Sequence, residues 1–439
     1  MAPLENLMTE LDLGDYVENT PPPFGHPMLK FFSFEPGYIN LNHGAFGSLP
    51  TPVNRACKAL GDRIEANPDK FMRLDYHRLL VSVREKVANL IGVPTDECVI
   101  VPNASAAAGI ILRGFDWKTG DIIVGASTTY ANVAKTLQYI HDMNPQTTFS
   151  IFPLALPVSH AEIIKGFRAH LRALPRLPPS ELNPSPKIVC VMDSIISNPG
   201  ILLPWKEMVK ICEEEGVWSV VDAAHSIGQE VDLNLSEVKP DFWFSNCHKW
   251  LFAKRGCAVL HVPKRNQHLI TSSFPTSNMY VSPGELSGTD WMAKSDENND
   301  WVLRFNWTGT LDFVPYLSIS AALEFRQWLG GEKKINDYCH DLAIRGGKRL
   351  VELLGTRLMD ESENAEETLN MVNVELPLYD VPADKIAYVQ DTLRDRLLKD
   401  FNTYAAHFPH NDRFWMSDFE YIGNAFSTVC KEIQETLRT

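Results

Sequence analysis

Short apolar runs alternate with amphipathic segments through most of the chain. Runs of strand length lie at 98–101, 122–125, 188–192, 218–221, 242–244 and 257–262. Segments between them, such as 79–93 and 205–216, repeat apolar residues at helical spacing. Short buried strands separated by helices predict an α/β fold with a mainly parallel sheet between helices. Ligands of such sheets bind beyond the carboxyl ends of the strands.

The pattern changes after residue 312, where long helical stretches surround a strand-like run at 369–377. This change predicts a smaller α+β domain at the C-terminal end. The expected parts are an N-terminal arm at 1–36, a large domain at 37–312 and the small domain at 313–439, with its last helix starting near 418. Two stretches predict loops. They are the proline-rich 173–187 and the polar, glycine-containing 282–300.

Composition narrows the class of protein. The 439 residues include 55 acidic and 41 basic side chains, a net charge of −14, which argues against nucleic-acid binding. No apolar run approaches the roughly 18 residues of a membrane span, and the acidic N-terminus is not typical of a signal peptide. Eight scattered cysteines without a CxxC pair predict no metal site and a reducing compartment, the cytoplasm.

Two residues that follow neighbouring predicted strands suggest a chemistry. Asp222 ends one apolar run, and Lys249 follows the next. Alone, the aspartate is typical of a turn or helix cap, and the lysine of a solvated surface. Together they can converge on one pocket. Pyridoxal 5′-phosphate (PLP) requires this pair, because it takes an amine for its Schiff base and a carboxylate opposite its pyridine nitrogen.

Further residues could complete such a pocket. Asn103, Ala104 and Ser105 begin a helix after a strand, where free amides and the helix dipole favour an anion such as phosphate. Ser245 and His248 flank Lys249 and could donate to the same anion. Tyr130 could either close the core or stack on the cofactor and supply a proton. Thr310 lies in a segment that alone is typical of an ordinary turn.

Three stretches carry a family resemblance. They are YINLNHGAFGSLPTPV at 38–53, VVDAAHSIGQ at 220–229 and DFWFSNCHKWLFAKRGCAVLHVP at 241–263. Together they resemble the class V aminotransferase-like group of fold-type I PLP enzymes, in its isopenicillin N epimerase-like branch. Fungal hercynylcysteine sulfoxide lyases and loline-pathway cyclase-type enzymes look most similar. The resemblance covers roughly 24 to 430.

The resemblance implies a role for each matched residue. It makes Lys249 the Schiff-base lysine and the acid/base at Cα, and Asp222 the partner of the pyridine nitrogen. It places His225 near the ring hydroxyl, and it stacks Tyr130 on the ring as proton donor to the leaving group. It assigns Asn103, Ala104, Ser105, Ser245 and His248 to the phosphate, Thr310 to the phosphate of the other subunit in a homodimer, and Asn42, His43 and Arg73 to the substrate, with the subunit interface as the alternative for Arg73.

The resemblance also implies a reaction that begins with loss of the α-proton from a small amino-acid substrate. Elimination of a β-sulfur group would make the protein a C–S lyase on a cysteine-derived substrate, the outcome we rank first. Carbon–carbon bond formation, as in a Mannich- or aldol-type cyclase of fungal biosynthesis, and epimerisation remain open. A non-catalytic PLP-binding relative is the alternative from a different class.

Two departures from the family pattern leave the substrate open. The strand at 148–152 reads TFSIF and lacks the cysteine that the lyases carry there. Met416 follows Trp415 directly, where family members insert a segment with an arginine that clamps the substrate carboxylate. Arg413 is the nearest basic residue, and its position does not match.

Overall fold

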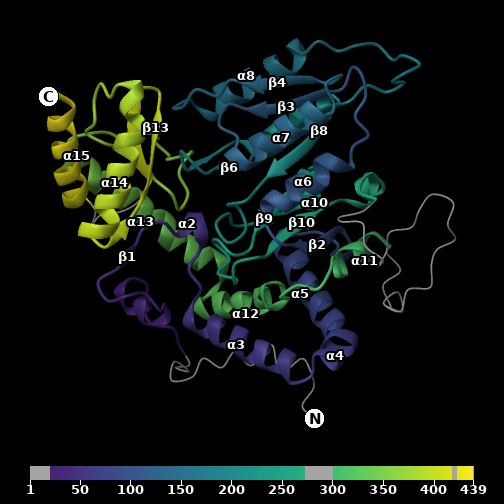
Figure 1. Ribbon diagram of the computed structural model, residues 1–439, viewed down its shortest axis with the longest axis horizontal. Coiled ribbons are helices and arrows are strands. Elements are labelled where there is room, and N and C mark those ends of the chain that lie inside the picture. The colour runs from purple at the N-terminus through teal and green to yellow at the C-terminus, as the bar shows by residue number, and fades with distance from the viewer. Residues whose placement is uncertain (1–19, 272–299, 418–422, 439) are drawn as a thin grey trace.

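A seven-stranded sheet forms the centre of the protein in a computed structural model that describes residues 20–271, 300–417 and 423–438 (Figure 1). In the order in which they pair, its strands are β2 (Cys98–Val101), β10 (Ala258–His261), β9 (Phe242–Asn246), β8 (Trp218–Asp222), β5 (Ile188–Asp193), β3 (Ile122–Ala126) and β4 (Thr148–Phe152). All neighbours run parallel except β10, which is antiparallel to both β2 and β9. The predicted mainly parallel α/β fold is confirmed.

Helices cover both faces of this sheet, because neighbouring strand residues point to opposite sides. On β5, Val191 belongs to one buried cluster, whereas Cys190 and Met192 belong to the other. The first face is covered by α6 (Ala104–Gly114), α7 (Ala131–Met143) and α11 (Asp300–Asn306). The second is covered by α5 (Tyr76–Ile91), α8 (His160–Ala173), α9 (Trp205–Glu214) and α12 (Val314–Leu329). The chain between α8 and β5 forms no helix, as the prolines of 173–187 predict.

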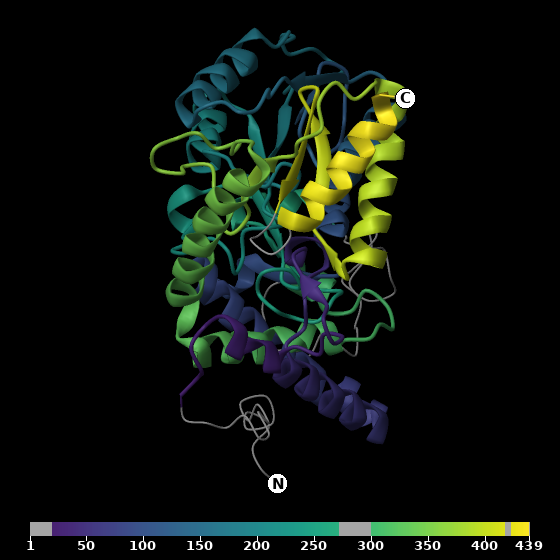
Figure 2. The same cartoon turned by 90° about the vertical axis from the view of Figure 1, so that its left-hand side faces the viewer.

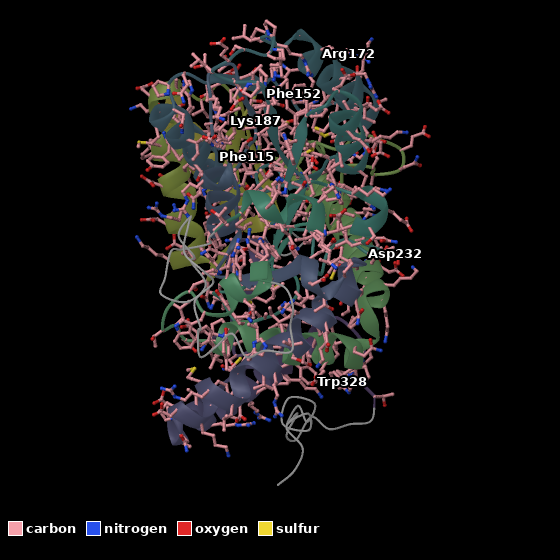
Figure 3. The ribbon with its side chains drawn as sticks, turned by 90° about the vertical axis from the view of Figure 1, so that its right-hand side faces the viewer. Phe115, Phe152, Arg172, Lys187, Asp232 and Trp328 are labelled. Carbon is pink, nitrogen blue, oxygen red and sulfur yellow. The ribbon has the colours of Figure 1, made fainter. Side chains whose placement is uncertain are left out.

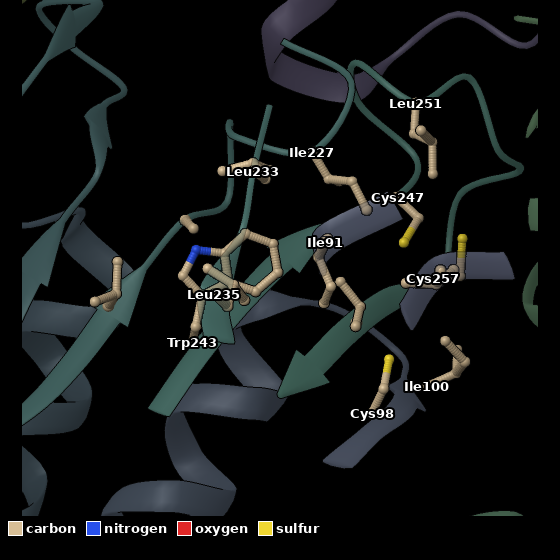
Figure 4. Close-up of a cluster of buried hydrophobic side chains, with 14 of the residues drawn as sticks. Ile91, Cys98, Ile100, Ile227, Leu233, Leu235, Trp243, Cys247, Leu251 and Cys257 are labelled. Atoms are coloured by element: carbon tan, nitrogen blue, oxygen red, sulfur yellow. The ribbon is translucent and has the colours of Figure 1, made fainter. Parts of the chain in front are cut away.

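The loop that follows β9 is anchored in the buried cluster on the second face of the sheet, the face covered by α5, α8, α9 and α12 (Figure 4). Cys247 and Leu251, on either side of Lys249, are fully buried together with Trp243, Cys257 and Ile227. Burying an aliphatic side chain such as Leu251 or Ile227 contributes about 1.5–3 kcal/mol. The two ends of the Lys249 loop are therefore held by packing.

A smaller sheet forms beside the large one, on the left in Figure 1. It consists of β11 (Asn373–Glu375), β14 (Arg413–Ser417) and β13 (Ala406–His410), all antiparallel. Its core contains residues of α13 (Gly331–Leu354), α14 (Ile386–Asp400) and α15 (Gly423–Arg438). The division expected after residue 312 stays a prediction. The helix just after that point, α12, shares the core of the large sheet.

Most of the N-terminal part of the described chain lies below the two sheets in the view of Figure 1. It contains η2 (His26–Phe31), β1 (Ile39–Asn40), α2 (His43–Phe46), α3 (Thr51–Ala66), α4 (Pro68–Lys70) and the π-helix η3 (Phe71–Asp75). Phe31 packs against Trp328 with ring centroids 5.3 Å apart, at the end of the molecule opposite Phe152 (Figure 3). The segment around α3 and α4 extends from the body at the lower right of Figure 2.

Short elements complete the described chain. They are β6 (Ile195–Ile196), β7 (Ile201–Leu202), β12 (Thr403–Tyr404), α10 (Leu235–Val238), η4 (Thr95–Glu97), η5 (Lys264–Leu269) and η6 (Ala383–Lys385). β1 pairs in parallel with β12, which ties the N-terminal part to the smaller unit. The loop predicted at 282–300 lies, except for its last residue, outside the described residues. Within the described part, every helix is too short or too polar to span a bilayer.

Candidate active site

A cavity of about 230 Å³ opens at the carboxyl ends of the strands. It is lined by Ala45, Phe46, Asn103, Ala104, Ser105, Tyr130, Val133, Asp193, Ile195, Ser197, Asp222, Ala224, His225, Asn246, His248 and Lys249. Eight predicted site residues are among them: Asn103, Ala104, Ser105, Tyr130, Asp222, His225, His248 and Lys249. The structure therefore brings together residues that lie up to 146 positions apart, from Asn103 to Lys249.

The Lys249 loop is held in place by the segment around α2. Nε2 of His43 lies 3.0 Å from the Lys249 carbonyl oxygen, and burial lowers the pKa of His43 to about 4, so the neutral ring donates this bond. Gly47 (φ 68°) approaches so closely that a Cβ there would lie 1.8 Å from the His248 carbonyl oxygen. His43 and Asn42 do not line the cavity, although both were predicted to face the substrate. For His43 the reason is its contact with the Lys249 backbone.

The Lys249 amine points into the cavity beside a histidine. Its Nζ lies 3.0 Å from Nε2 of His225. Burial lowers the pKa of Lys249 to about 8, against the attraction of Asp222. Near neutral pH an appreciable fraction of this amine is consequently unprotonated, the form that reacts with carbonyl carbons.

Two carboxyl groups lie side by side at the cavity wall. Asp222 on β8 is in register with Asp193 on β5, and both residues are buried. Burial raises the pKa of Asp222 to about 6, while the Ala224 N–H, 3.0 Å away, and Lys249 favour its charged form. Burial and the charge of Asp222 raise the pKa of Asp193 well above its usual value. Of the two carboxyl groups, Asp222 is therefore the one that ionises first, and Asp193 keeps its proton to higher pH.

Sequence reasoning missed Asp193. The sequence does contain a pattern that points to Asp193, because the apolar runs IVCVMD and WSVVD both end in aspartate. Parallel strands that pair directly bring their last residues together. Two equally placed aspartates on adjacent strands could therefore have been paired once the strand order was known, and that order is not visible in the sequence.

An Asp193→Asn variant should make the stability of the apoprotein less dependent on pH. In the unfolded chain Asp193 ionises near pH 4, whereas in the folded chain it keeps its proton to much higher pH. The wild-type apoprotein therefore loses unfolding free energy as the pH rises from about 4 toward the raised pKa of folded Asp193, by up to about 1.4 kcal/mol per pH unit, and the amide removes this loss. Thermal midpoints between pH 5 and 8 measure the effect. The exposed Asp62→Asn serves as control, and equal loss at every pH in Asp193→Asn would contradict the prediction.

The first turn of α6 forms another part of the cavity wall. Asn103 caps the helix by accepting from Ala106 N at 2.8 Å, and Asn246 Oδ1 accepts from Ala104 N at 2.9 Å. The intervening Ser105 N–H has no partner among the described residues. A free amide in the first turn of an eleven-residue helix is suited to an anion.

Asn246 occupies the place that the sequence analysis gave to Ser245. Adjacent strand residues face opposite sides, and Asn246 is the one that lines the cavity. Ser245 points into the core, where its hydroxyl donates to the Ala223 carbonyl and accepts from Ile227 N at 3.1 Å. The structure therefore does not place Ser245 where it could donate to an anion in the cavity.

Tyr130 and His248 border the same space. Tyr130 precedes α7 and is 45% exposed, so its ring is accessible from the cavity. His248 Nδ1 lies 2.9 Å from the Cys257 carbonyl oxygen, and because a carbonyl only accepts, this nitrogen carries a proton. The bond joins the Lys249 loop to the residue before β10.

Three other residues lie outside this cavity. Thr310 lines a different one, of about 600 Å³, with Lys254 and Asp312, and its role toward another subunit stays a prediction. Arg73 lies on η3 with Nε 3.0 Å from Asp69 Oδ1, so the structure does not bring it to the Lys249 cavity. Arg413 forms an ion pair with Glu375 in the small sheet and does not line the Lys249 cavity.

The cavity residues fit PLP at three points. The Lys249 amine matches the aldehyde, the ionised Asp222 matches a protonated pyridine nitrogen, and the Ser105 amide matches the phosphate. The amine and the carboxylate attract each other, which places them within one small-molecule site. No set of His, Cys, Asp and Glu in the part of the chain that the structure describes is arranged to hold a metal ion.

Comparisons with known proteins agree with this fit. A curated L-cysteine desulfhydrase-like protein, lolT1, from Epichloe uncinata is 30% identical, with 94% of this chain and 97% of the relative covered. The hercynylcysteine sulfoxide lyase of Schizosaccharomyces pombe is 27% identical, with 93% and 98% covered. The solved structure of the cystine C–S lyase C-DES with cysteine persulfide has a TM-score of 0.66 at 20% identity, covering 91% of this chain and 97% of that one, which shows a shared fold.

The family model for class-V aminotransferases matches residues 48–391. That range contains all the residues of the cavity wall except Ala45 and Phe46. Both the resemblance inferred from the three sequence stretches and the cofactor that it implied are confirmed. The chain belongs to the class-V aminotransferase family of PLP-dependent enzymes.

Proposed function

We propose that this enzyme is a C–S lyase that eliminates a sulfur group from the β-carbon of a cysteine-derived amino acid. The observation that carries the proposal is the convergence of Lys249, Asp222 and Tyr130 on one cavity. The names of the relatives, a desulfhydrase-like protein and a sulfoxide lyase, support the same reaction class.

Each of these residues has a task in the elimination. Bound PLP supplies an electron sink that weakens the bonds at the substrate α-carbon. Lys249 takes the α-proton, because its amine reaches the cavity and its lowered pKa of about 8 suits a base near neutral pH. Asp222 holds a proton on the pyridine nitrogen, and Tyr130 gives a proton to the departing sulfur. Ser105, Asn103 and Asn246 orient the phosphate end.

The test is a panel of amino acids offered to the holoenzyme. The panel contains L-cysteine, S-substituted cysteine sulfoxides and bulky α-amino acids, with pyruvate and exchange of the α-proton for deuterium followed in parallel. Pyruvate from the sulfur substrates is the expected result. Exchange without pyruvate would contradict the lyase and would favour the epimerase or the carbon–carbon-bond-forming cyclase. If the cofactor is bound but neither exchange nor pyruvate is observed, the result favours the non-catalytic relative.

A Tyr130→Phe variant separates the two proton transfers. We expect it to retain α-proton exchange within a few-fold and to lose about 10²-fold or more in pyruvate formation, because only the leaving sulfur needs the hydroxyl. The ring that borders the cofactor is preserved. Tyr139→Phe, on the exposed face of α7, is the matched control. Equal losses in both rates would contradict this role for Tyr130.

We also propose that the enzyme is a cytoplasmic homodimer. All eight cysteines are free thiols, which supports a reducing compartment. Thr310, exposed beside the second cavity, would reach the phosphate bound by the other subunit. A holoenzyme that sediments as a monomer with full cofactor content would contradict the shared site.

A further inference from the structure

Trp250, the residue after the proposed cofactor lysine, makes a hydrogen bond that determines the proton position on its neighbour. Its indole Nε1 lies 3.2 Å from Nδ1 of His225. An indole nitrogen is only a donor. Nδ1 of His225 must therefore be the acceptor and carries no proton.

The second ring nitrogen of His225 contacts the reactive amine. Nε2 lies 3.0 Å from Lys249 Nζ. A neutral imidazole without a proton on Nδ1 carries it on Nε2, so Nε2–H is the donor in this contact. The amine must then accept the bond with a lone pair. An ammonium group has no lone pair, and the geometry thus requires Lys249 as the free amine.

The surroundings keep this arrangement in place. The Trp250 ring packs against His43 with centroids 5.3 Å apart, and Gly44 lies against the Trp250 and His225 rings. A Cβ at Gly44 would lie 3.1 Å from the Trp250 ring and 3.5 Å from the His225 ring. The charged or titratable groups facing the pair are Asp222 and His248. Burial lowers the pKa of His225 well below its usual value, so the ring stays neutral.

We propose that Trp250 is a positioning residue that fixes the tautomer of His225 and thereby holds Lys249 as a free amine ready for the cofactor aldehyde. In that reaction the amine nitrogen bonds the aldehyde carbon, and the aldehyde oxygen leaves as water. The inference rests on the proposed role of Lys249.

A Trp250→Phe variant tests the proposal, because phenylalanine keeps the ring packing and removes the N–H. In the apoprotein, the acetylation rate of Lys249 is measured against pH by mass spectrometry. We expect the pH midpoint to rise by about one unit and the rate at pH 7 to fall about tenfold, since each unit changes the amine fraction tenfold. Trapping of PLP by borohydride should slow by the same factor. Trp328→Phe, which packs on Phe31 and Phe325, is the control.

Nitrogen NMR of His225 in the wild-type apoprotein tests the tautomer without any variant. An unprotonated Nδ1 and a protonated Nε2 support the proposal, and a proton on Nδ1 overturns it. An unchanged midpoint for Lys249 in a folded Trp250→Phe variant also overturns it. If PLP is instead trapped on another lysine in the wild type, the role of Lys249 fails while the tautomer measurement still stands. The two failures are thus distinguishable.

Discussion

A Lys249→Ala variant should neither form a borohydride-reducible bond to PLP nor turn over substrate above about 10⁻⁴ of the wild-type rate. The side chain is expected to provide both the covalent anchor and the base at the α-carbon, and general bases alone contribute about 10²- to 10⁴-fold. Its environment supports this dual use. The amine is part-buried, contacts His225 at 3.0 Å and is attracted by Asp222. Mass spectrometry after reduction and the rate of pyruvate formation measure the two losses.

Lys210→Ala is the matched control, because Lys210 lies exposed on α9 and lines neither the Lys249 cavity nor the one beside Thr310. Removing it should leave the covalent bond and the turnover within a few-fold of wild type. A reducible bond that persists in Lys249→Ala would show that another lysine carries the cofactor.

The sheet and half of the cavity wall could be predicted because they depend on short-range patterns. Apolar runs of strand length gave the parallel sheet, and the carboxyl ends of those runs pointed to Asp222 and Lys249. These predictions need only the rule that ligands lie beyond the carboxyl ends of parallel strands. They do not require the strand order.

The differences between the expected and the observed positions have a common physical cause, which is side-chain direction. Ser245 and Asn246 are adjacent, and only the pleat of β9 decides that Asn246 faces the cavity. His43 was expected near the substrate, but the close approach of Gly47 to the His248 backbone turns the segment so that the ring meets the Lys249 carbonyl. Asp193 required knowledge that β5 and β8 are neighbours. Each of these facts depends on tertiary contacts that periodicity does not encode.

Replacing Asp222 by asparagine should lower kcat about 10²- to 10³-fold while leaving covalent capture of PLP intact. The amide oxygen can still accept from Ala224 N, 3.0 Å away in the wild type, so the local backbone is preserved. What is lost is the negative charge that holds a proton on the pyridine nitrogen. Removing one preorganised electrostatic group from an active site typically lowers kcat by about 10²- to 10³-fold. Steady-state rates of pyruvate formation, with cofactor content measured in parallel, test the expectation. A rate within threefold of wild type would contradict it.

We also predict the direction in which the pKa of Lys249 shifts in the Asp222→Asn variant. Asp222 raises the pKa of Lys249, which burial lowers to about 8. Without the charge, the pKa should fall further, and capture of PLP by the apoprotein should extend to lower pH. In the Trp250→Phe variant, loss of the indole N–H should shift the pH midpoint of PLP capture to higher pH. Opposite shifts in the two variants would separate the charge on Asp222 from the proton position on His225, because a general loosening of the site would move both midpoints in the same direction.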